Sequence, residues 1–174
     1  MRRQIKFETK MRGQNPQRGF SLIELLIVVA VILIIAGIAI PNFLRARISA
    51  HEASAAASLR SINTAEATYN STYGAGYGSL LQLSTPGIPC VPTVAIACLV
   101  DPVLSTAVKS GYNFTALPVN AGNVDFVAAA VPITVGTTGG RTFCVDETGA
   151  IHADPTGGAA PADDVGCEAL PILQ

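Results

Sequence analysis

The sequence lacks the residue patterns on which most enzymes depend. It has no G-x-S-x-G nucleophile turn, no phosphate-binding glycine loop and no H-E-x-x-H motif. Its two histidines, His51 and His152, lie far apart, and its four cysteines form no C-x-x-C pair, so a zinc site is not expected. We therefore predict that the protein is not an enzyme and that it has no catalytic residue, metal ion or cofactor.

Positive charge is scarce beyond residue 19. The first 19 residues hold six of the eleven Lys and Arg side chains and one of the twelve Asp and Glu side chains. The rest of the chain has five basic and eleven acidic side chains, a net charge of −6. Scattered basic residues such as Lys109 and Arg141 form no basic stripe, so the sequence does not predict binding of nucleic acid through the globular domain.

A membrane-spanning helix is predicted after Glu24. Residues 25–44 carry no charge, and as a helix rising about 1.5 Å per residue they cover roughly the 30 Å hydrocarbon core of a bilayer. A secretory signal has a shorter apolar region followed by a small-x-small cleavage site, whereas this run continues into Pro41 and Asn42. Glu24 is unusual here, because an ionised carboxylate in lipid costs on the order of a few kcal/mol and so requires a partner.

The charge asymmetry also predicts an orientation. A basic end stays on the cytoplasmic side of a membrane, which places the acidic remainder on the other side. Arg45 and Arg47, just beyond the apolar run, weaken this asymmetry slightly. We therefore expect a single-pass protein in the inner (cytoplasmic) membrane, with its N-terminus in the cytoplasm.

Residues 18–25, RGFSLIEL, resemble the N-terminal signal of type IV prepilins and of the related pseudopilins of type II secretion. The resemblance implies that a prepilin peptidase removes the leader 1–19 by cutting between Gly19 and Phe20, and that the new terminal Phe20 is N-methylated. It also implies that Glu24 of one subunit pairs with the Phe20 amine of a neighbour, and that this pair guides assembly.

Three functions are considered as alternatives, of which the first two follow from this resemblance and the third belongs to another class. The first is a structural subunit polymerised into a type IV pilus for adhesion, motility or DNA uptake. The second is a pseudopilin of a type II secretion system, and the third is a membrane-anchored binding domain that never polymerises. The implied partners are further copies of the chain and related pilins, the prepilin peptidase and methyltransferase, an inner-membrane assembly platform, and lipid before assembly. The mature form is then expected in a periplasmic or extracellular filament.

One long helix is predicted through the transmembrane or filament-core segment 20–44 and the amphipathic segment 45–73. Pro41 is expected to kink this helix without ending it, and Gly37 lies where the family tends to place a flexible turn. After Pro41 apolar residues recur at steps close to 3.6, at Leu44, Ile48, Ala55, Leu59, Ile62 and Tyr69. The helix is expected to stop at three alternating glycines, Gly74, Gly76 and Gly78.

The globular head 74–174 is predicted to be α+β, with the long helix packed on a small antiparallel sheet as in the type IV pilin fold. Residues 74–110 are rich in turn-forming residues and are expected to form a long loop with a short helical turn near 79–83. Three or four strands are expected over 112–117, 124–131, 141–145 and 150–153. A turn with Gly149 joins the last two strands, and the tail from Asp154 is expected to be a loop.

The four cysteines are expected to form two disulfides, because the domain is predicted to lie outside the cytoplasm. Proximity in sequence favours Cys90 with Cys98 and Cys144 with Cys167 among the three pairings that four cysteines allow. The second of these loops also looks like the disulfide-bounded region near the end of many pilins.

Two further groups of residues have an ordinary explanation. Tyr69, Tyr73 and Tyr77 recur every four residues and are expected to pack rather than to carry chemistry. Some pseudopilins bind calcium near the C-terminus, but the spacing of the acids in this tail fits no defined calcium loop, so we expect them to be solvated. These acids are Asp154, Asp163, Asp164 and Glu168.

Mass spectrometry of the assembled protein is expected to find a chain that begins at N-methyl-Phe20. The same mature terminus is expected whether translation starts at Met1 or at Met11, because the implied cut follows Gly19. A different terminus, or an intact leader on the assembled form, would contradict the assignment of the peptidase.

Overall fold

A computed structural model describes residues 19–87 and 89–173, so most of the predicted leader lies outside the described residues. The chain divides into two compact units, Met1–Ile40 and Pro41–Gln174, which we call the apolar unit and the globular unit. A single helix, α1 (Leu22–Tyr73), contributes to both, and Pro41 lies inside it. The kink expected at Gly37 or Pro41 stays a prediction.

Within the globular unit, α1 is amphipathic and buries one face. The buried side chains recur at helical spacing and are Ala55, Ala56, Ser58, Leu59, Ile62, Ala65, Glu66 and Tyr69. The predicted stripe began too early, because Leu44 is exposed and Ile48 is half-buried. The helix ends as predicted at Tyr73, where Gly74 adopts a left-handed conformation (φ +60°) that glycine takes without steric cost.

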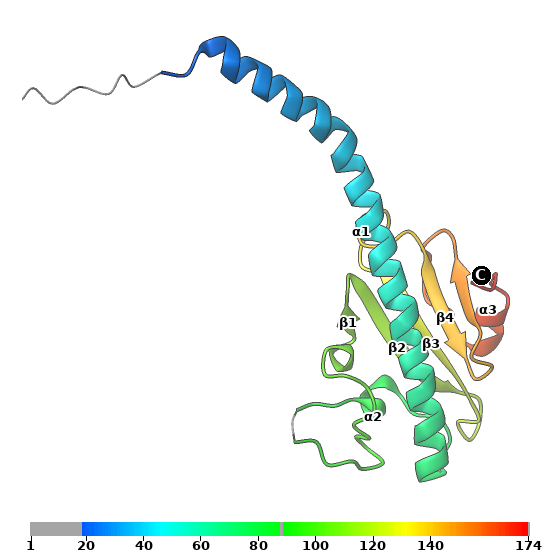
Figure 1. Ribbon diagram of the computed structural model, residues 1–174. Coiled ribbons are helices and arrows are strands. Elements are labelled where there is room, and N and C mark those ends of the chain that lie inside the picture. Colours follow the sequence, from blue (N-terminus) through cyan, green and yellow to red (C-terminus); the bar gives the residue numbers. More distant parts are fainter. Residues whose placement is uncertain (1–18, 88, 174) are drawn as a thin grey trace, which may run out of the picture. The chain divides into compact units, whose positions relative to one another are not determined.

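A five-stranded antiparallel sheet lies against this part of α1, with the strands in chain order (Figure 1). The strands are β1 (Val108–Lys109), β2 (Tyr112–Val119), β3 (Asp125–Pro132), β4 (Thr142–Asp146) and β5 (Ile151–Asp154). The α+β fold is therefore confirmed, but the expected count of three to four strands is wrong by one short strand.

The missed strand β1 depends on a tight turn rather than on a hydrophobic pattern. Ser110 and Gly111 both have positive φ, +50° and +77°, which is the backbone of a two-residue hairpin turn. This turn pairs Val108 with Asn113 and Lys109 with Tyr112. Two residues are too few to show the period-2 alternation from which a strand is predicted.

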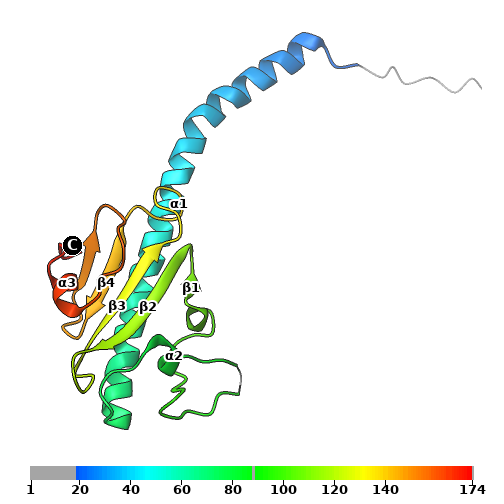
Figure 2. The ribbon, with the colours of Figure 1, turned by 180° about the vertical axis from the view of Figure 1, so that it is seen from behind.

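Both faces of the sheet are covered in its centre. One face packs on α1 through Phe114, Phe126 and Phe143, which are almost completely buried. The opposite face is turned toward the viewer in Figure 2, where the sheet lies in front of α1. On this face Val127 and Cys144 pack beneath the C-terminal tail. Burial on both sides explains why β3 is an almost continuous apolar run.

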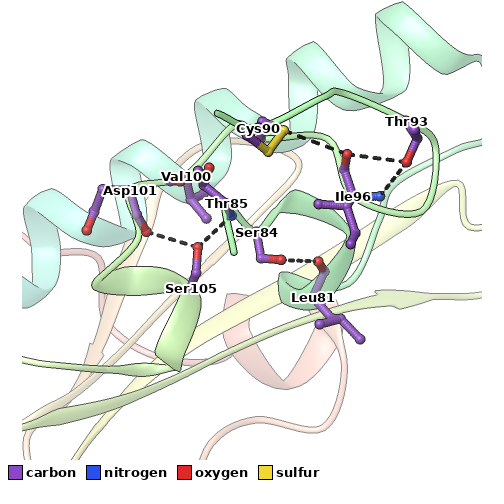
Figure 3. The surroundings of a disulfide bond; sticks show 10 residues. Leu81, Ser84, Thr85, Cys90, Thr93, Ile96, Val100, Asp101 and Ser105 are labelled. Carbon is purple, nitrogen blue, oxygen red and sulfur yellow. Dashed lines mark hydrogen bonds between the residues drawn. A yellow bond between two sulfur atoms is a disulfide. The ribbon is translucent and has the colours of Figure 1, made fainter. Parts of the chain in front are cut away.

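The segment between α1 and the sheet is a loop held by local hydrogen bonds (Figure 3). It contains the expected short helix, α2 (Leu80–Leu83), which begins with a capping box between Ser79 and Gln82, and one 3₁₀ turn, η1 (Leu104–Thr106). A disulfide joins Cys90 to Cys98. The amide of Thr85 donates to Ser105 Oγ at 2.7 Å, so the two ends of the loop are also tied together.

The C-terminal tail is more ordered than expected. It contains a short helix, α3 (Asp164–Glu168), which begins at the capping residue Asp163 and is linked to β4 by the Cys144–Cys167 disulfide. The tail then bonds to β5, where the amide of Ala153 donates to Pro171 O at 2.8 Å. The two disulfides are the pairs that the sequence favours, and the tail protects the β5 edge of the sheet.

Replacing Cys144 and Cys167 by alanine is expected to lower the free energy of unfolding by about 3 kcal/mol, because this disulfide closes a loop with a sequence separation of 23. Replacing Cys90 and Cys98, at a separation of 8, is the matched comparison and is expected to cost less. Urea unfolding of the purified chain in detergent, followed by tyrosine fluorescence, measures both. A smaller cost for the longer loop would contradict this expectation.

Candidate functional site

The predicted cleavage point lies in accessible, non-helical chain. Gly19 and Phe20 precede the first helical residue, Leu22, and Phe20 is 85% exposed. A methyl group built on Gly19 would meet nothing within 4 Å. The described residues on both sides of the predicted cut are therefore exposed, and α1 begins only two residues after Phe20.

Glu24 lies in the first turn of α1, where its amide donates to Ser21 O at 3.1 Å. A carboxylate at this position interacts favourably with the positive end of the helix dipole. The side chain is exposed, and within residues 19–87 and 89–173 it forms no ion pair. The described residues therefore provide no counter-charge for Glu24.

The apolar unit presents a surface with no polar face after Glu24. The most apolar 18-residue window of α1 has a mean hydropathy of 3.2, and none of it is buried. Every large apolar side chain from Leu22 to Ile40 is between 46% and 79% exposed. Such a surface is stable only in lipid or against other apolar helices.

In the globular unit, two glutamates attach α1 to other segments. The carboxylate of Glu52 accepts two hydrogen bonds from Arg141, at 2.7 and 3.0 Å, and one from the amide of Gly140 at 2.9 Å. The Arg141 guanidinium also lies 5.2 Å from the centroid of the Phe143 ring. Beside them, His51 Nδ1 lies 3.0 Å from Thr138 O, so this contact fixes α1 at the start of β4.

The second glutamate, Glu66, is completely buried. Its Oε2 accepts a hydrogen bond from the Gly78 amide at 2.8 Å, while Oε1 has no partner. Burial raises the pKa of Glu66 from 4.5 to about 7, and the Gly78 amide opposes this shift. No role was predicted for this residue from the sequence, although Leu59, Ile62 and Glu66 continue one helical face.

The tyrosines pack as expected. Tyr69 is buried and donates its hydroxyl to Val94 O at 2.7 Å, while its ring lies 5.0 Å from that of Tyr73. Tyr77 packs against Phe126 at 4.8 Å. They join the end of α1 to the loop and to the sheet.

The acids of the tail serve local structure. Asp154 accepts hydrogen bonds from the amides of Thr156 and Gly158, and Asp163 caps α3. In the described part of the chain, no three His, Cys, Asp or Glu side chains come together in a way that would hold a metal ion. Of the tail acids, Asp164 lies near acids outside the tail, at the end of β4 beside α3.

Comparisons with known proteins match the N-terminal region first. The family model described as the prokaryotic N-terminal methylation motif matches residues 14–40. The type IV major pilin protein PilA of Myxococcus xanthus is 47% identical over 56 residues, which cover 32% of this chain and 26% of that protein. The type IV wide pilus major component PilA4 of Thermus thermophilus is 37% identical over 82 residues, which cover 45% of this chain and 63% of that protein.

These matches therefore span less than two thirds of each relative. No solved structure gives a significant match.

Stability is expected to fall by about 3 kcal/mol as the pH rises from 4.5 to 7, because the folded state holds the Glu66 proton more tightly than the unfolded state does. Above pH 7 this contribution is fully lost. Glu66→Gln should remove most of this slope. A smaller slope of the same sign remains from Glu147, whose pKa burial also raises.

Urea unfolding at several pH values, monitored by tyrosine fluorescence, tests this prediction, since all four tyrosines lie in the globular unit and the chain has no tryptophan. An unchanged slope in Glu66→Gln would contradict it.

Proposed function

We propose that the chain, which has the N-terminal methylation motif and an α+β fold, is a prepilin that is processed, N-methylated and polymerised into a type IV pilus. The observation that carries this proposal is the apolar part of α1, whose side chains are exposed on every side behind a peptidase signal. A helix of this kind serves as a membrane anchor before cleavage and as the core of a helical bundle afterwards.

Glu24 and Phe20 are proposed to set the register of that bundle. Hydrolysis of the Gly19–Phe20 bond creates an amine at Phe20, and this amine is a cation at neutral pH. Apolar helices slide past one another at little cost, because hydrophobic contacts are non-directional. An ionised carboxylate in an apolar surrounding loses its hydration, and a cation beside it offsets part of that loss. The pair therefore favours the one axial position of the helices in which the two charges meet.

The same proposal gives the location and partners of the chain. The precursor spans the inner membrane once, with the basic leader in the cytoplasm and the acidic globular unit outside. Its partners are the prepilin peptidase and methyltransferase, an assembly platform in the inner membrane, and other copies of itself. Adhesion, motility or DNA uptake is the activity proposed for the filament.

The pseudopilin alternative is less well supported, because the Myxococcus xanthus and Thermus thermophilus relatives are both named as pilus components. The tail disulfide between Cys144 and Cys167 also favours the pilus. The anchored domain that never polymerises differs from both, because an anchor has no need of a carboxylate inside its apolar segment.

Glu24→Ala is expected to reduce filaments recovered from cells by about tenfold or more, while membrane insertion and leader cleavage continue, because the variant keeps its apolar helix and loses the register contact. Filaments are sheared from cells and quantified by immunoblot, and the membrane fraction gives the amount and size of the unassembled chain. Ser21→Ala, at the residue immediately before α1, is the control and should assemble normally. Normal filaments from Glu24→Ala would contradict the proposal and favour a simple anchor.

A further inference from the structure

Four acidic side chains gather beside α3, at the end of β4. Asp146 is the last residue of β4 and pairs with Val127 of β3, two residues after Asp125 on the same face. Glu147 follows Asp146, and Asp164 begins α3, which contacts both strands. We call Asp125, Asp146, Glu147 and Asp164 the acidic end of the globular unit.

The acidic end contains buried carboxylate oxygens without partners. Asp146 is completely buried, and its Oδ1 accepts from the amide and hydroxyl of Thr148, while its Oδ2 has no hydrogen-bond partner. Glu147 Oε2 is also buried and unpartnered. Burial, and the charges of Asp146, Asp125 and Asp164, raise the pKa of Glu147. Asp146 is not accessible from outside, so a docking cation would meet the half-buried side chains of Asp125, Glu147 and Asp164, and its charge would also stabilise the buried carboxylates beside them.

The globular unit also has unpaired positive charge at its opposite end. Two of its five basic side chains, Lys109 and Arg141, form ion pairs with Asp101 and Glu52. The other three, Arg45, Arg47 and Arg60, are exposed and form no ion pair within the described ranges 19–87 and 89–173. Arg60 stands alone further along α1, whereas Arg45 and Arg47 lie two residues apart, and we call this pair the basic end of the globular unit.

The two ends cannot meet within one chain. Arg47 lies beside Gly136 and Thr137 in the loop before β4. The turn after β4 instead contacts α1 at Asn63, because a methyl group built on Gly149 would lie 2.8 Å from the side-chain nitrogen of Asn63. Along α1 the distance from Arg47 to Asn63 is about 24 Å. Figure 1 shows the loop before β4 and the helix α3 towards opposite ends of β4.

From these observations we infer that the basic end of one copy docks on the acidic end of the next copy. The contact is heterologous, because it joins two different surfaces of the same molecule, and a heterologous contact that does not close into a ring extends into a filament. Arginine suits this site, because its planar guanidinium forms bidentate hydrogen bonds with carboxylates. The inference rests on the proposed function and adds to it a second subunit contact, outside the apolar bundle.

Charge reversal tests the contact in the full-length chain, in cells that assemble the filament. Arg45→Glu/Arg47→Glu and Glu147→Lys/Asp164→Lys should each reduce sheared filaments by about tenfold, since like charges then face each other. Combining all four substitutions should restore filaments to within about twofold of the unmodified chain. Arg60→Glu reverses an exposed charge on α1 about 20 Å along the helix from Arg47 and should assemble normally.

Cross-linking provides a measurement that does not depend on the reversed variants folding. Arg47→Cys/Asp164→Cys, treated as filaments with a short bismaleimide, should give a ladder of covalent multimers. Each single cysteine variant should stay monomeric, because a heterologous contact places each residue beside a different one. A monomeric double variant, or a single variant that forms dimers, would overturn the proposed contact.

A metal ion or a lipid headgroup could also bind at one of the two charged ends, and each would give a different result. If chelation by EDTA abolishes filaments while reversal of the arginines does not, the acidic end holds a metal ion and the inference fails. If Arg45→Glu/Arg47→Glu reduces membrane insertion rather than assembly, these arginines bind lipid headgroups, and the inference fails as well.

Absence of filaments from the unmodified chain would instead overturn the proposed function itself, whereas normal filaments from all variants would overturn only this contact.

Discussion

The burial of one face of α1 against the sheet is the interaction on which the globular unit depends. Leu59, Ile62 and Tyr69 are removed from water almost completely, and each such side chain contributes roughly 1.5–3 kcal/mol. The same helix has no buried residue from Leu22 to Ile40. The helix α1 therefore suits two different environments. Apolar residues cover its whole circumference in the apolar unit, whereas in the globular unit they occupy the one face that packs on the sheet.

The polar groups on the buried face add specificity to this packing. Apolar contact alone leaves a helix free to shift or rotate on a sheet, whereas Glu52 is held by the Arg141 guanidinium and the Gly140 amide at one position along β4. Glu66 bonds similarly to the Gly78 amide and ties the loop back to the helix. Burying Glu66 is the unfavourable part of that attachment, since one of its oxygens has no partner.

Periodicity predicted the elements that have enough residues to show it. The apolar run, the end of α1 at Tyr73 and the four longer strands follow from repeated side-chain patterns and from glycine. The strand β1 and the helix α3 were missed, because one depends on a two-residue turn and the other on a disulfide and a capping Asp163. The acidic end could not be predicted either, since strand register and tail docking bring together residues as far apart as Asp125 and Asp164.

Both proposed contacts between copies pair an acidic group with one of the few positive charges left after residue 19. In the proposed filament a purely apolar bundle would permit many axial offsets between neighbouring copies, because hydrophobic energy depends on buried area and not on direction. Opposite charges select among these offsets, and like charges exclude the rest. Glu24 with the Phe20 amine supplies such a selection in the apolar unit, and the two charged ends supply another in the globular unit. Since both proposed contacts belong to one chain, neighbouring copies would have to satisfy the two together, which leaves fewer arrangements for the proposed filament than either contact alone.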